Sequence, residues 1–166
     1  MGSWGVTARE TDTGLDYLAL IETKCLKPID FKYFDVHAAL EMLRNHIIGG
    51  IKKENKRSLS KNRIWEYIDY NFPHSYNYAV LMVAECLAEY LKKGEFIIED
   101  YETKTKMKIT EFIFTDSDLY ELLNELYKML DPNHHFTKSW FEEKTRKKSQ
   151  AHLEKLCKTL KRGFMR

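Results

Sequence analysis

Glycine, proline and cysteine are scarce in this chain of 166 residues, which contains seven, three and three of them. So little glycine and proline excludes a collagen-like or low-complexity chain, and three cysteines are too few for a disulfide-built miniprotein. The sequence also has no glycine-rich phosphate-binding pattern. This absence argues against an enzyme that cradles a nucleotide in such a loop.

Long hydrophobic runs are missing as well. The longest, residues 79–84, stops at Glu85 and is far short of the ~20 residues that cross a bilayer. The cysteines (Cys25, Cys86 and Cys157) are far apart, and the first residues show no signal-peptide pattern. We therefore expect a cytoplasmic protein with reduced thiols and no membrane partner.

The residues that are present predict one compact domain over 1–166, of the α+β class and mainly α. Hydrophobic residues make up 43% of the chain and aromatic residues 13%. Apolar periodicity predicts about six helices, over residues 12–24, 36–48, 60–70, 75–93, 116–130 and 137–162. Alternation of apolar and polar residues predicts one antiparallel β-hairpin within residues 96–114, with strands 96–101 and 107–114.

Local signals place several helix ends. Thr13 with Asp16 resembles a capping box for the first helix, and Asp35 is the expected N-cap of the second. Gly49-Gly50 is expected to stop or hinge that second helix. The helix over 75–93 is apolar around most of its circumference, which is typical of a central helix. The middle of the last helix, residues 142–150, is polar all round and is expected to project into solvent.

The net charge of +2 conceals a segregated pattern. Residues 1–50 carry −2, residues 51–72 carry +3, residues 73–137 carry −6 and residues 138–166 carry +7. Such a division either steers a charged partner or is satisfied between apposed helices. Two basic clusters are candidates for nucleic-acid phosphates. They are Lys52, Lys53, Lys56, Arg57, Lys61 and Arg63, and Lys144, Arg146, Lys147 and Lys148.

The order helix–helix–helix–hairpin is loosely similar to a winged helix. In that fold the helix before the hairpin, here residues 76–93, enters the major groove of DNA. This helix carries Glu85 and Glu89 and is otherwise apolar, which suits a polyanion poorly. A nucleic-acid-binding regulator of winged-helix type is therefore an alternative rather than the leading hypothesis.

Aromatic residues cluster at one predicted helix–helix turn. The candidates for a partner-binding site there are Tyr70, Phe72, His74, Tyr76 and Tyr78. Rings at an exposed turn are typical of interface hot spots. The alternative is that the same rings pack locally within the fold.

Catalytic and metal signals are weak. His37 and Glu41 lie one helical turn apart, and His134-His135 lies in a loop, but neither pair makes a metal site alone. The Glu102–Lys104 triplet that follows Asp100 resembles a nuclease pattern, yet such triplets occur five times in the chain. We expect no cofactor and no metal; an enzyme with dispersed active-site residues is a further alternative.

The N-terminus resembles a family of small uncharacterised bacterial proteins that begin M-G-x-W-G. The matching residues are Met1-Gly2-Ser3-Trp4-Gly5, then Glu10, Asp12, Leu15-Asp16 and Leu18. The resemblance implies a bacterial protein of the Firmicutes, often from a mobile element, with no known activity. It implies a regulatory or anti-defence role.

The leading hypothesis is therefore a non-catalytic binding or regulatory protein. On the mobile-element interpretation, it is an anti-CRISPR-like inhibitor that acts on a nucleoprotein machine. Its partner would be a protein or nucleoprotein complex, with DNA or RNA contacted through the basic clusters. The sequence leaves the oligomeric state open.

Overall fold

The computed structural model describes residues 6–55, 73–100, 103–138 and 142–165. For residues 51–55 and 73–75 it describes only the helical backbone. The helices are α1 (Asp12–Ile21), α2 (Val36–Asn55), α4 (Pro73–Lys93), α5 (Asp116–Leu130), α6 (His135–Lys138) and α7 (Glu143–Leu160). The predicted α+β, mainly α class is confirmed. The expected helix over 60–70 and the residue Trp4 lie outside the described residues.

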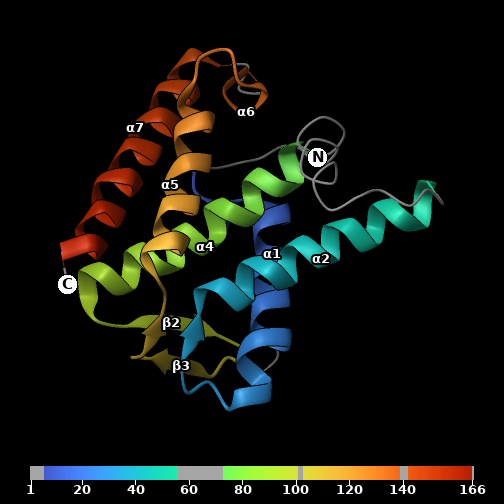
Figure 1. Cartoon of the computed structure of the whole chain (residues 1–166), viewed down its shortest axis with the longest axis vertical. Coiled ribbons are helices and arrows are strands. Elements are labelled where there is room, and N and C mark those ends of the chain that lie inside the picture. The colour runs from blue at the N-terminus through green and yellow to red at the C-terminus, as the bar shows by residue number, and fades with distance from the viewer. Residues whose placement is uncertain (1–5, 56–72, 101–102, 139–141, 166) are drawn as a thin grey trace.

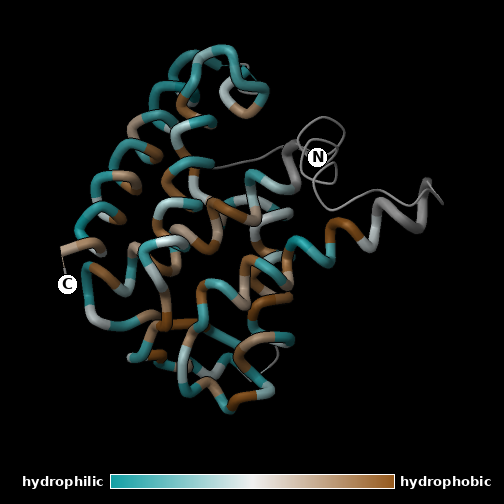
Figure 2. Tube along the Cα trace, in the orientation of Figure 1, coloured by the Kyte–Doolittle hydropathy of each residue, from teal (hydrophilic) through white to brown (hydrophobic). Residues whose placement is uncertain are grey.

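Helix α4 forms the centre of the molecule, as its apolar circumference predicts. It crosses the middle of Figure 1, with α1 and α2 on one side and α5 and α7 on the other. Its side chains from Tyr76 to Ala84 and from Cys86 to Ala88 are buried. Figure 2 shows the hydrophilic residues gathered on the outer helices, most continuously along α7. Since α4 has no exposed face over these residues, it has no surface that could enter a major groove, and the winged-helix comparison fails at this point.

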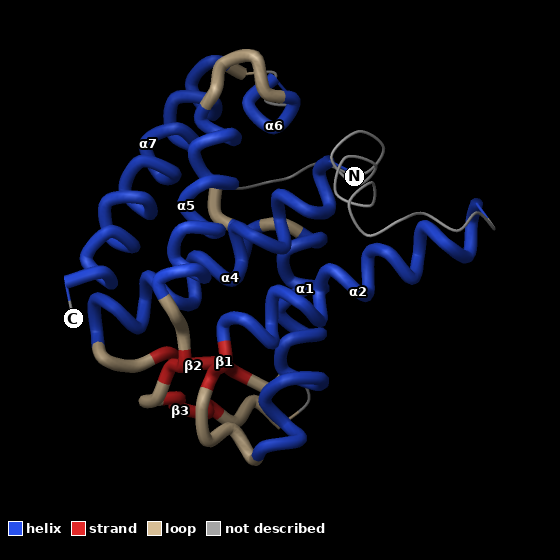
Figure 3. Tube along the Cα trace, viewed as in Figure 1, coloured by secondary structure: helices blue, strands red, loops and turns tan. Residues whose placement is uncertain are grey.

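The predicted hairpin is present at one end of the helices (Figure 3). Strand β2 (Phe96–Glu99) pairs antiparallel with β3 (Lys106–Ile109). The expected strand over 107–114 is too long, because β3 ends before Thr110-Glu111. The next two residues form β4 (Phe112–Ile113), which pairs in parallel with β1 (Phe34–Asp35).

An aromatic cluster joins the two small sheets. The Phe34 ring stacks on Phe112, with centroids 4.8 Å apart, and meets the edge of Phe96 at 6.3 Å. The Tyr90 ring from α4 also stacks on Phe112, with centroids 4.4 Å apart. The rings thus hold β1 and β4 against the hairpin and against the central helix.

The N-terminal cap differs from the expected one. A 3-10 turn over Ala8–Glu10 precedes α1, and Thr11 is the N-cap. Its Oγ1 accepts a hydrogen bond from the Gly14 N–H at 3.0 Å and donates one to the Ala8 carbonyl at 2.9 Å. The capping box of Thr13 with Asp16 is therefore wrong. The Asp35 cap of α2 is confirmed, since its Oδ1 accepts from the Ala38 N–H at 2.9 Å.

Two further helix boundaries correct the sequence prediction. Helix α2 continues through Gly49-Gly50 to Asn55, so the glycines do not stop it. The helix predicted over 137–162 is divided into α6 and α7, and a 3-10 turn over Lys161–Met165 follows α7. The polar segment 142–150 does not project freely into solvent, because Ser149 is buried and α7 packs against α4 and α5.

Substitution of Gly14 by alanine is expected to destabilise the protein. An added Cβ would lie 2.0 Å from the Ala8 carbonyl oxygen, which is backbone and cannot move aside without breaking the turn. We expect a loss of about 1–3 kcal/mol or more in the free energy of unfolding, measured by urea denaturation. Gly50→Ala is the matched control, because a Cβ there meets nothing within 4 Å. This substitution should raise the free energy of unfolding by about 0.5–1 kcal/mol. Equal effects of the two substitutions would contradict this packing.

The described part of the chain contains no helix long and apolar enough to cross a bilayer.

Candidate functional site

A line of basic side chains runs along the outer face of α7 and into the 3-10 turn Lys161–Met165 that follows it. Its members are Lys144, Lys148, Lys155, Lys158 and Arg162, all exposed; we call this set the basic stripe. Their spacings of four, seven, three and four residues keep them within about 40° of one line, since a helix turns about 100° per residue. At about 1.5 Å per residue, the line is roughly 27 Å long.

The buried residues on the opposite face of α7 determine that the stripe faces solvent. Leu153, Leu156 and Leu160 are buried against the body of the protein, where α7 contacts α4 and α5. Burial of these leucines requires the lysines half a turn away to face solvent. The spacing of the leucines and the spacing of the basic residues therefore specify the same rotation of α7 about its own axis.

Helix α4 adds charge to the C-terminal end of the stripe. Its last turn carries the exposed residues Lys92 and Lys93, of which Lys93 pairs with Glu89 on the same helix at 3.2 Å. The pKa of Lys92 is lowered, first by partial burial of the amino group and then by the nearby charges of Lys155 and Arg162. Lys92 therefore lies close to the stripe and widens it at this end.

The stripe is not neutralised within the described part of the chain. No ion pair there involves any of its five members, whereas Lys147, off the line, pairs with Glu143 at 2.7 Å. The other acidic residue of α7, Glu154, is exposed on the flank of the helix. For these five residues, the described part of the chain therefore does not show the expected alternative, in which the basic C-terminal segment pairs with acidic helices.

The predicted basic clusters are only partly brought into the stripe. Lys144 and Lys148 belong to it, Lys147 lies beside it, and Arg146 is half-buried on another face. Of the first cluster, Lys56, Arg57, Lys61 and Arg63 lie outside the described residues, as do the side chains of Lys52 and Lys53. The sequence prediction missed Lys92, Lys155, Lys158 and Arg162. The signal for three of them was their helical spacing along residues 144–162, which a search for dense clusters does not detect.

The aromatic turn is described only in part. Tyr70 and Phe72 lie outside the described residues, and so does the side chain of His74. Tyr76 and Tyr78 are buried, with 5% and 9% exposed, and the Tyr78 ring meets the edge of Phe136 at 5.7 Å. For these two residues local packing, rather than an exposed interface, is the arrangement found.

The two acidic residues of α4 are used within the fold. Glu85 Oε1 accepts from the Ala8 N–H at 2.9 Å and lies 2.8 Å from His152 Nε2. Glu89 Oε2 lies 3.0 Å from the Arg9 guanidinium. These contacts connect the N-terminal turn, α4 and α7. They therefore fix α7 against the body of the protein, with the basic stripe on its outer side.

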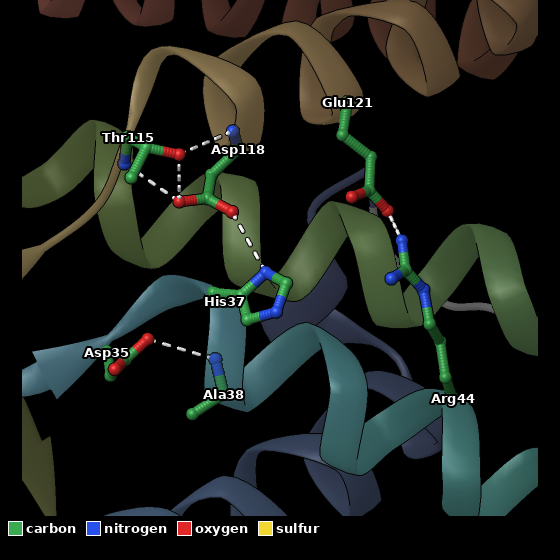
Figure 4. Close-up of polar contacts among 7 residues, drawn as sticks. All are labelled: Asp35, His37, Ala38, Arg44, Thr115, Asp118 and Glu121. Carbon is green, nitrogen blue, oxygen red and sulfur yellow. Dashed lines mark hydrogen bonds and ion pairs between the residues drawn. The ribbon is translucent and has the colours of Figure 1, made fainter.

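Polar contacts also connect α2 with α5, as Figure 4 shows. His37 Nδ1 lies 3.2 Å from Asp118 Oδ1, and Arg44 forms an ion pair with Glu121. A histidine held by a carboxylate supplies two of the three members of a catalytic triad. Here the His37 side chain is 64% exposed, and Asp118 Oδ2 accepts from the Thr115 N–H at 2.7 Å as part of the α5 cap. His37 therefore lies on the surface, Asp118 is buried beneath it, and the pair serves to join two helices.

The remaining chemical candidates have structural roles. Asp100 accepts from the Thr103 N–H at 2.7 Å and lies 3.3 Å from Lys27 Nζ. These interactions, of which the hydrogen bond from the Thr103 backbone is the strongest, hold the pKa of Asp100 far below its usual range. The carboxylate therefore stabilises the hairpin loop and does not serve as a metal ligand. Burial raises the pKa of Cys86 to about 12 and of Cys157 to about 11, so both thiols stay protonated near neutral pH.

The described histidines are likewise not brought together into a metal site. His135 Nε2, one of the predicted loop pair, lies 2.8 Å from Asn77 Nδ2. Among the residues that the structure describes, no group of three or more His, Cys, Asp or Glu side chains is arranged to hold a metal ion.

Comparison of the chain with protein-family models, with curated proteins and with solved structures finds no match. The resemblance of the N-terminus to a bacterial family therefore stays a prediction. The feature from which a function can be inferred is the basic stripe.

Proposed function

We propose that the protein is a non-catalytic binding protein that contacts nucleic-acid phosphates through the basic stripe. The observation that carries the proposal is the row of five exposed cations along α7 and the turn that follows it, with no ion pair to the described residues. Each cation that meets a phosphate releases condensed counterions, and this release supplies most of non-specific affinity. The expected interaction is therefore strong at low salt and indifferent to base sequence.

The composition of the stripe favours phosphates over an acidic protein surface. Four of its five members are lysines, and lysine is depleted in protein–protein interfaces, whose centres are apolar. A lysine ammonium on a flexible stem adapts to phosphates as a point charge. A regular line of such charges fits a polymer with a regularly repeating charge.

A salt titration tests the proposal. Binding to labelled DNA, single-stranded and duplex, is measured by fluorescence anisotropy between about 50 and 200 mM salt. Five or six phosphate contacts predict a fall in affinity of about 10²–10³-fold over this range. Binding that does not change with salt, or no binding at 50 mM, would contradict the proposal. Binding to an acidic protein, with none to DNA at 50 mM salt, would assign the stripe to a protein partner.

The second candidate is an inhibitor of a nucleoprotein machine, the role that the N-terminal resemblance implies. The same observation supports it, because nucleic acid held inside such a machine presents the same phosphates to the stripe. Its test adds the purified protein to a CRISPR effector and follows DNA cleavage. Unchanged cleavage with an excess of protein would reject this candidate and leave direct nucleic-acid binding in place.

A further inference from the structure

Two exposed tyrosines share the outer face of α5. Tyr120 is 67% exposed and Tyr127 is 45% exposed. They are seven residues apart, which places them on one side of the helix, about 10 Å from each other along its axis. Leu119, Leu122 and Leu126 are buried on the inner side. The packing of α5 therefore directs both rings outward.

Both rings lie beside the 3-10 turn that follows α7 and carries Arg162, the last member of the basic stripe. Lys161 Nζ, one residue before the stripe's Arg162, is 5.4 Å from the centroid of the Tyr127 ring. The Phe164 ring is 4.7 Å from the Tyr120 ring. Lys161 and Phe164 belong to the 3-10 turn that continues α7, and α5 lies alongside α7 in Figure 1. The two rings thus lie next to the C-terminal end of the stripe, with Lys161 against Tyr127 and Phe164 against Tyr120.

The environment of the tyrosines is cationic and apolar. The pKa of Lys161 is raised, mainly by its hydrogen bond with Tyr127 and then by the electrostatic effect of the same side chain. Its ammonium group therefore stays charged well above neutral pH. Met165, next to Phe164, is 80% exposed. Of the acidic residues of α5, Glu121 and Glu125 are paired with Arg44 and Lys128, while the exposed Asp116 lies one turn before Tyr120 on the same side of the helix. The surface therefore offers apolar rings next to the positive charge of Lys161, with one carboxylate beyond Tyr120.

From this juxtaposition we propose that the ligand is a single-stranded nucleic acid, whose bases stack on Tyr120 and Tyr127 while its phosphates follow the basic stripe. This inference rests on the proposed function and narrows it to one class of ligand. Exposed aromatic side chains beside a positively charged track are the elements with which proteins hold single strands. A duplex keeps its base faces inside its own stack, so it can use the stripe but not the rings.

The experiment compares three ligands of about 20 nucleotides: a single strand of thymidines, a duplex, and an abasic strand with the same phosphates. Affinity is measured by fluorescence anisotropy at one salt concentration. We expect the thymidine strand to bind more tightly than the other two. Tyr120→Leu with Tyr127→Leu should weaken its binding by about 5- to 150-fold per ring, with an unchanged salt slope. Tyr120→Phe with Tyr127→Phe keeps both rings and should bind within about twofold of the native chain.

The outcomes separate the two proposals. If the abasic strand or the duplex binds as tightly as the thymidine strand, or if the leucine pair binds normally, stacking is rejected while salt-dependent phosphate binding stands. If the native chain binds none of the three ligands, the proposed function fails, and this inference fails with it. Thermal unfolding of the leucine pair, expected to match the native chain, excludes misfolding as the cause of a weaker affinity.

Discussion

Replacement of Lys148, Lys155 and Lys158 by glutamate is expected to abolish nucleic-acid binding without disturbing the fold. These three residues occupy the middle of the basic stripe and are exposed. Each lysine that no longer meets a phosphate weakens binding by about 1–1.5 kcal/mol, so affinity should fall by at least about 10²–10³-fold. The salt slope should also fall by about one for each phosphate that the variant leaves without a cation. Anisotropy at several salt concentrations measures both quantities.

A matched control separates the stripe from total charge. Lys24, Lys32 and Lys106 are also exposed lysines, and they lie on other elements. Their replacement by glutamate changes the net charge by the same amount. We expect this control to keep most of the affinity. Equal losses in the two triple variants would show that overall charge, and not the line along α7, governs binding.

The largest effect on stability is expected from Phe34→Ala. The Phe34 side chain is 1% exposed and packs on Phe112 and Phe96 in the cluster that joins the small sheets to α4. Truncation of a buried phenylalanine costs about 3–5 kcal/mol, which is a large part of the about 5–15 kcal/mol that stabilises a typical domain. Urea denaturation followed by circular dichroism should show the shift.

Ile97→Ala provides the comparison for Phe34. Ile97 lies on β2 of the neighbouring hairpin and is 40% exposed. Its truncation should cost well under half as much, because little apolar surface is removed from the core. A Phe34→Ala cost no greater than that of Ile97→Ala would show that the aromatic cluster does not support the fold.

Periodicity predicted those parts of the fold in which one element is long enough to repeat. The apolar circumference of residues 75–93 predicted a central helix, and α4 is central. The alternation in residues 96–114 predicted the hairpin. The parallel pair β1–β4 was missed, since a strand of two residues has no period to detect. Its position is determined by the packing of Phe34 on Phe112, which is a tertiary contact.

The candidate surface was predictable only in part, for a similar reason. Lys144 and Lys148 were found because they lie in a dense cluster, whereas Lys155 and Lys158 are spread along the helix. Whether a lysine joins a line depends on which face of α7 is buried, and the leucines of α7 carry that information. The sequence did not identify Tyr120 and Tyr127 as part of this surface, because sequence alone does not say how far a ring on a helix extends into solvent.

The position of α4 has a consequence for cooperativity. Helices α1 and α2, which come before it in the chain, and α5 and α7, which come after it, all pack on this one helix. Neither set can bury its apolar face unless α4 is in place, so each set depends on the other through a shared support. We therefore expect the two sets to unfold in a single transition, and their amide protons to exchange together, with no stable state in which only one of them is folded.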